Sequence, residues 1–298
     1  MTNETKIYSI ICDEMKGLLD TMVSDFAKNY DKKGNNWILS GFDNIIVSNM
    51  VFVSSFESKY GNMFENIIRE IVKINYGENN TPYFVKGVGI DEEEYEFTIR
   101  TISKRRRNNN KRQDQVIISK FDKRANDGIL SQFRASRIAQ GTGRNRVPSR
   151  LTQSEMPKLL NENITCSKDV YIQPVDLMFY DENDGKYKLF EIKAGGDLDS
   201  SNAPKNIEKM LKIYSCLGKE NSNLYFATLY NKNGEGKTWT GVVKKHISED
   251  SMLIGKDFWN MILKDITFEE YLEIYKTAFN DTGFNDVLSD LITSTAKF

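Results

Sequence analysis

The stretch that decides the fold is DVYIQPVDLMFYDENDGKYKLFEIKAGG, residues 169–196. Two largely apolar segments, at about 170–180 and 186–193, flank the turn DENDG, which ends in Asp184-Gly185. Alternating apolar residues are typical of a strand, and Asp-Gly between two such runs is a strong hairpin signal. The pattern therefore predicts a strand, a tight turn and a second strand.

Three charged residues stand inside these otherwise apolar strands. Glu191 and Lys193 share one face of the second strand because side chains alternate with a period of two, and Ile192 between them is expected to point into the core. The hairpin brings Asp176 alongside them. Two carboxylates and an ammonium at one sheet edge can support metal-assisted hydrolysis, with Asp176, Glu191 and the Ile192 carbonyl as candidate ligands. Lys193 would hold the attacking water and stabilise the charged transition state.

This arrangement resembles the PD-(D/E)XK phosphodiesterase superfamily, through PVD at 174–176 and EIK at 191–193. In the strict form of the first motif the proline directly precedes the aspartate, whereas here Val175 separates them. The resemblance implies a nuclease in which the Asp, Glu and Lys of these motifs are catalytic. It also implies Mg²⁺ as cofactor, with Mn²⁺ as an acceptable substitute.

A glutamate on a helix before the core joins the metal site in members of this superfamily. The segment YGNMFENIIREI, residues 60–71, fits such a helix. The resemblance makes Glu65 the best candidate for this catalytic position and Glu70 the next. A solvated glutamate on the surface of a helix is the alternative interpretation of Glu65.

Within the superfamily the chain is most similar to type II restriction endonucleases. The similarity is carried by EIKAGGDLDSSNAPKN at 191–206 and GKDFWNMI at 255–262, and it covers about 55–265. It implies double-strand breaks at a short specific DNA sequence, a homodimer and no nucleotide cofactor. It further implies a cognate DNA methyltransferase in the same system that makes no direct contact.

One basic segment lies in a chain of formal net charge −1. Residues 104–150 hold 14 basic and three acidic residues, a local charge of +11, so the remainder carries −12. A localised positive charge indicates contact with a polyanion, here double-stranded DNA. The alternative is a solvated loop.

Lys205, on the helix after the second strand, is a further candidate for phosphate contact. The candidate DNA-binding residues are Arg105, Arg106, Arg107, Arg134, Arg137, Arg144, Arg146 and Lys205.

Composition excludes several other chemistries. His246 is the single histidine, so neither a two-histidine zinc site nor a nuclease with several histidines can form within one chain. The three cysteines have no CxxC spacing, which argues against a disulfide framework or a cysteine zinc site. No apolar run is long enough to cross a membrane, and the N-terminus lacks the pattern of a secretory signal. We therefore expect no membrane association and a cytoplasmic location.

The remaining segments predict an α/β (α+β) fold: a restriction-endonuclease-like core with a mixed central sheet flanked by helices, a helical N-terminal region and a basic insert. We expect a single domain, 1–298, with a nuclease core at about 55–265, a DNA-contact insert at 104–150 and a helical extension at 266–298. Helices are predicted at 5–30, from Ser55 to Gly77, at 202–218 and from 255 onward; strands at 93–102, 223–231 and 237–245; and partly helical structure at 117–140.

Three other functions fit parts of the pattern. A repair, recombination or nicking nuclease would use the same residues without sequence specificity. A nucleic-acid-binding protein with a degenerate nuclease fold is a second alternative, against which the intact Asp176, Glu191 and Lys193 argue. In the third, the basic segment binds a protein partner, and this differs from DNA binding in its weaker dependence on salt.

Overall fold

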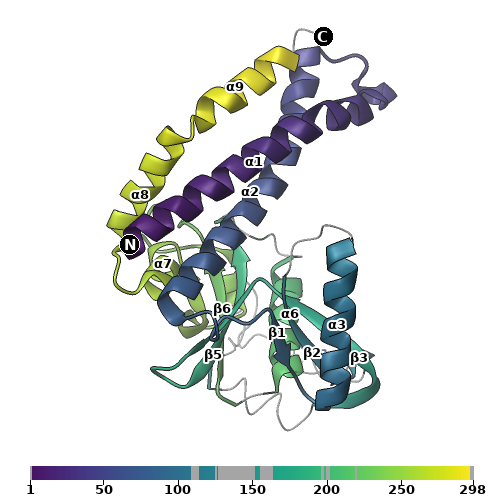
Figure 1. Ribbon diagram of the computed structural model, residues 1–298, viewed down its shortest axis with the longest axis vertical. Helices are drawn as coiled ribbons and strands as arrows, with labels where there is room; N and C mark the ends of the chain where they lie inside the picture. The colour runs from purple at the N-terminus through teal and green to yellow at the C-terminus, as the bar shows by residue number, and fades with distance from the viewer. Residues whose placement is uncertain are drawn as a thin grey trace, which may run out of the picture. The chain divides into compact units, whose positions relative to one another are not determined.

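A computed structural model (Figure 1) describes residues 2–108, 114–124, 126, 152–154, 164–195, 198, 202–218 and 220–295. Its contacts group the chain into two compact units. One comprises Met1–Asn75 and Ile262–Phe298, and the other comprises Tyr76–Met261. That the chain is a single domain, with the boundaries given above, stays a prediction. Across the described ranges, no helix combines the length and the apolar character that a membrane span requires.

The first unit is helical. Its elements are α1 (Asn3–Gly34), the short 3₁₀ helix η1 (Trp37–Leu39), α2 (Asn44–Tyr76), α8 (Phe268–Asp281) and α9 (Phe284–Thr295). α1 contains the helix predicted at 5–30, and its buried side chains run from Ile7 to Phe26 at helical spacing. α2 begins earlier than Ser55, at Asn44, because the Asp43 carboxylate accepts the Ile45 N–H and provides a start for the helix. α2 ends directly before Gly77, whose φ of 94° stops a helix at low cost.

The second unit holds the strands. In chain order its elements are β1 (Phe84–Lys86), α3 (Glu92–Asn108), β2 (Gln115–Phe121), β3 (Cys166–Val175), β4 (Leu177–Asp181), β5 (Lys186–Lys193), α6 (Asn202–Leu217), β6 (Ser222–Thr228), η3 (Val242–Lys245), η4 (Glu249–Ser251), β7 (Met252–Ile254) and α7 (Lys256–Leu263). The second hairpin strand and the helix after it therefore lie where the sequence predicts them.

The strands form two sheets. β1, β2 and β3 make a three-stranded sheet in that order, parallel between β1 and β2 and antiparallel between β2 and β3. β4, β5, β6 and β7 make a four-stranded sheet, in which β4 and β5 are antiparallel and the other pairs are parallel. The expected class of mixed sheets flanked by helices, with a helical N-terminal region, is confirmed.

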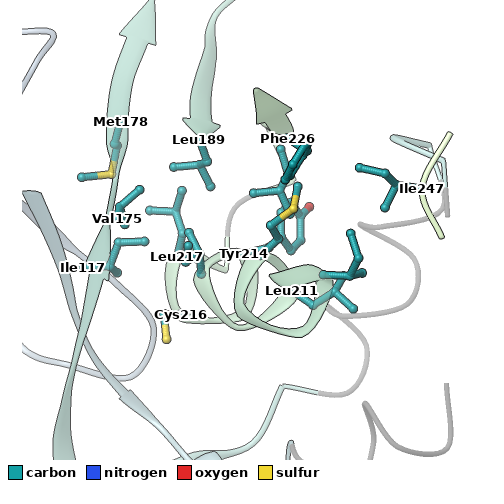
Figure 2. Packing of buried hydrophobic residues seen from close by; sticks show 14 of the residues in the cluster. Ile117, Val175, Met178, Leu189, Leu211, Tyr214, Cys216, Leu217, Phe226 and Ile247 are labelled. Carbon is teal, nitrogen blue, oxygen red and sulfur yellow. The ribbon is translucent and has the colours of Figure 1, made fainter. Parts of the chain in front are cut away.

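Helix α6 covers the joint between the two sheets. Its apolar face packs in one core with residues of both sheets, among them Ile117 of β2, Met178 of β4 and Leu189 of β5. Figure 2 shows Tyr214 and Leu217 pointing from the helix toward these strands, whereas Leu211 lies on the side of Ile247. Because this face of β5 also carries Glu191, the packing brings α6 next to the predicted site.

The predicted strand at 93–102 is wrong: these residues lie in α3. Tyr95, Ile99 and Ile102 recur at helical spacing and pack on Val116 and Ile118 of β2, and α3 lies alongside β1–β3 in Figure 1. Three glutamates in its first turn and three arginines in its last suit the helix dipole. Alternation over ten residues was too short to distinguish a strand from this pattern.

Two further segments differ from the prediction. Residues 237–245 form a loop followed by η3, not a strand, and Val243 and Trp239 are buried there. Residues 117–121, predicted as part of a partly helical segment, belong to β2, whose side chains are nearly all buried. A fully buried strand lacks polar alternation, so periodicity alone does not separate it from a buried helix.

Candidate active site

Asp176 stands alone between two strands of different sheets. β3 ends at Val175 in the three-stranded sheet and β4 begins at Leu177 in the four-stranded sheet. The predicted first hairpin strand is therefore interrupted at the candidate catalytic residue. The Ile192 N–H donates to Asp176 Oδ2 at 2.9 Å, so the carboxylate continues the hydrogen bonding of β5 beyond the Leu177–Phe190 pair.

Gln115 holds this junction from the first sheet. Its side-chain amide accepts the Met178 N–H at 2.8 Å and donates to the Met178 carbonyl at 2.6 Å and the Pro82 carbonyl at 2.9 Å. The side chain thus pairs with β4 as another strand would. Gln115 is fully buried, where such polar groups are costly unless satisfied. It fixes the backbone two residues after Asp176.

Glu191 and Lys193 lie together on β5, as predicted. Lys193 Nζ lies 2.5 Å from Glu191 Oε1. The Glu191 side chain is only 1% exposed, whereas that of Lys193 is 31% exposed. The Ile192 side chain between them, which was predicted to point into the core, is only half-buried.

A second lysine, Lys209 of α6, joins the two carboxylates. Its Nζ lies 2.9 Å from Asp176 Oδ1 and 2.5 Å from Glu191 Oε2. The Glu191 carboxylate is thus shared, with Lys193 at one oxygen and Lys209 at the other. The oxygens of Asp176 and Glu191 converge on one point, which in this structure is the ammonium of Lys209.

The charges of the cluster alter the pKa of two of its members. Burial raises the pKa of Glu191, and the neighbouring Asp176 carboxylate raises it further, against the opposing effects of Lys193 and Lys209. For Lys209, burial lowers the pKa but the two carboxylates outweigh it, so the pKa of this lysine is raised. A buried carboxylate close to a second one is an environment that a cation stabilises.

The other predicted residues lie elsewhere or outside the described ranges. Glu65 is half-buried on α2 in the helical unit, and its role at the metal site stays a prediction. Arg105 and Arg107 are exposed in the last turn of α3, while Arg106 donates to the Asp114 carbonyl at 3.0 Å. Lys205 is exposed on α6, one turn before Lys209. The candidates that lie outside the described residues are Arg134, Arg137, Arg144 and Arg146.

Sequence reasoning missed Lys209 and Gln115. Lys209 directly precedes Met210 of the buried face of α6, so helical periodicity places it at the border of that face. This signal was present, but it does not show which strand residues the border meets. Gln115 is the first residue of a buried strand. No local sequence pattern indicates that it binds the Met178 backbone, because Met178 is distant in the sequence.

Among the residues that the structure describes, no group of three or more histidine, cysteine or acidic side chains could hold a metal ion. The two carboxylates are therefore the acidic donors that this cluster offers. Magnesium is held in proteins by one or two carboxylates together with waters and substrate phosphate. Asp176 and Glu191 fit that donor set, because their oxygens already converge on a cation.

Comparison with known proteins identifies the relatives of the chain. The family model of the type II restriction endonuclease HinfI matches residues 3–278. The type II restriction enzyme HgiCII of Herpetosiphon aurantiacus is 30% identical over 122 residues, which cover 39% of this chain and 41% of that protein. The match thus spans about two fifths of the length of this relative. No solved structure matches the chain. Since the family model covers nearly the whole length, this chain belongs to the HinfI family of type II restriction endonucleases.

Proposed function

We propose that this chain is a magnesium-dependent endodeoxyribonuclease that makes double-strand breaks at a short specific DNA sequence. The observation that carries the proposal is the convergence of Asp176 and Glu191 on one cation position, with Lys193 beside them. This is the chemistry expected of a PD-(D/E)XK site. Family membership supports DNA as the substrate.

Each residue of the cluster has a distinct task in this proposal. Asp176 and Glu191 hold the metal ion, with the Ile192 carbonyl as a further ligand. When bound, the metal ion supplies charge stabilisation on the phosphate and a lowered pKa for a coordinated water. Lys193 orients the attacking water through its Nζ and stabilises the negative charge that develops on the phosphate. Its side chain is more exposed than that of Glu191, so the ammonium is accessible to solvent and to substrate.

Contact with DNA is assigned to the basic segment 104–150. Its charge of +11 is concentrated in less than a sixth of a chain that is nearly neutral as a whole. Most contacts from such a segment go to phosphates and position the duplex, whereas a few arginines read base edges. Arg105 and Arg107 are its exposed arginines at the end of α3. We expect DNA affinity to fall steeply with salt.

A homodimer follows from the double-strand cut. The described part of one chain carries one cluster of Asp176, Glu191 and Lys193, and cutting both strands of a symmetric site needs two such clusters. We therefore propose a second copy as the partner. A cognate methyltransferase would protect host DNA without contacting this chain. Light scattering coupled to gel filtration tests the dimer, and a monomer at working concentration on specific DNA would contradict it.

Digestion of unmethylated phage DNA tests the proposed function. With Mg²⁺ we expect discrete bands on a gel, and with Mn²⁺ we expect cutting as well. Ca²⁺ should support DNA binding without cutting, because calcium takes oxygen ligands and activates water poorly. A smear or nicked circles would favour a repair or nicking nuclease. Intact DNA beside an active control enzyme would favour a non-catalytic binding protein.

A further inference from the structure

Lys209 reaches the cluster from a separate element. α6 packs across both sheets, and Lys209 extends from the border of its buried face to one carboxylate on β5 and to Asp176 between β3 and β4. The contacts are short, at 2.9 Å to Asp176 and 2.5 Å to Glu191. The Lys209 ammonium therefore occupies the point where the two carboxylates face each other.

Lys193 and Lys209 differ in where they meet Glu191. Lys193 contacts Oε1, while Lys209 contacts Oε2 and also Asp176. A metal cation held by both carboxylates would take the position of the Lys209 ammonium. The same cation could bind while Lys193 stays in place. A flexible lysine stem allows such an ammonium to leave without a change in the backbone.

We propose that Lys209 is a built-in counter-ion of the metal position: it keeps Asp176 and Glu191 together in the metal-free protein, and the catalytic metal ion must displace it. The inference rests on the proposed function, because it takes these carboxylates as metal ligands. Lys209 is thus a positioning residue that sets the affinity for metal.

The charge balance gives this exchange a consequence for substrate binding. With Lys209 in place, two carboxylates face two ammonium groups, and the cluster is neutral. When a divalent cation replaces Lys209, one positive charge is in excess. A phosphodiester brings one negative charge and restores the balance. Metal ion and DNA therefore each favour the binding of the other, and metal affinity is low until DNA is present.

Calorimetric titration with Ca²⁺, without DNA, tests the role of Lys209. If the Lys209 ammonium is away from the two carboxylates less than about a tenth of the time, it weakens the apparent affinity for Ca²⁺ by at least about tenfold. Lys209→Met should therefore bind Ca²⁺ at least about tenfold more tightly than the wild type. Lys193→Met should gain less, because Lys193 contacts Glu191 at Oε1, away from the Oε2 that faces Lys209. Lys212→Met is the matched control on α6, since Lys212 pairs with Glu208 at 3.4 Å, and it should bind as the wild type does.

Asp176→Asn separates failure of this inference from failure of the proposed function. Wild-type Ca²⁺ affinity in Asp176→Asn would refute the metal site itself. Loss of binding in Asp176→Asn, combined with unchanged or weaker binding in Lys209→Met, would overturn the role of Lys209 alone. Absence of binding in both the wild type and Lys209→Met would also overturn it, because removing the occupant should open the site. Circular dichroism checks folding, and Lys209→Gln replaces the methionine variant if that variant does not fold.

Discussion

The two ends of the β4–β5 hairpin use the same residue types in different ways. At the turn, Lys188 pairs with Asp184, whose side chain is 40% exposed, so this carboxylate keeps contact with water. At the open end, Glu191 is almost fully buried and is held by two lysines, one of them from α6. A buried carboxylate that needs two cations is an expensive way to stabilise a fold. The comparison therefore separates a structural ion pair from a site of chemistry.

Asp176→Asn should have the largest effect on activity. The substitution removes a carboxylate at the open end and weakens the hold on a metal ion that stabilises the transition state by several kcal/mol. We expect the cleavage rate to fall by about 1000-fold or more, which corresponds to ~4 kcal/mol. Single-turnover cleavage of a DNA fragment measures it. A cleavage rate within a few-fold of the wild type would show that the charged cluster at the open end is a structural ion pair, as the Lys188–Asp184 pair at the turn is.

Lys193→Met should have the second-largest effect on the cleavage rate. It leaves both carboxylates in place and removes the ammonium that we assign to the attacking water, at a cost of roughly 100-fold in rate. DNA binding in Ca²⁺ should be largely retained. Equal losses of binding and cleavage would instead assign Lys193 to DNA contact.

Gln115→Met tests how the open end is held. The variant leaves the Met178 N–H and carbonyl without their side-chain partner in a buried place. We expect the free energy of unfolding to fall by about 2 kcal/mol, as measured by urea denaturation. An unchanged midpoint would mean that the junction between the sheets does not need this amide.

Asp184→Asn should have the smallest effect on cleavage, and it sharpens the contrast with the open end. Asparagine can still accept the Lys186 N–H that Asp184 accepts in the turn, so mainly the charge opposite Lys188 is lost. Because the Lys188 side chain is only 6% exposed, this loss leaves a buried ammonium without its charged partner, and the free energy of unfolding should fall by about 3 kcal/mol, with an unchanged cleavage rate. A loss of cleavage in a normally folded protein would contradict the separation of the two ends.

The hairpin and its three charged residues could be predicted because the signals are local. Alternation, the Asp-Gly turn and the shared face of Glu191 and Lys193 follow from the strand period alone. The contact of Lys209 could not be predicted in this way, because it depends on which face of α6 packs against β5. The switch of sheets at Asp176 likewise depends on the pairing of Gln115 with a distant backbone. The misread strand at 93–102 shows the limit of periodicity in short segments.

The most direct test of the central claim compares Glu191→Gln with Asp184→Asn in single-turnover cleavage with Mg²⁺, beside DNA binding in Ca²⁺. Glutamine keeps the shape of the side chain at the open end and removes its charge. If the open end is the site of cleavage, Glu191→Gln binds DNA and does not cut it, while Asp184→Asn cuts at the wild-type rate. Cleavage by Glu191→Gln at a rate close to that of the wild type would contradict the account.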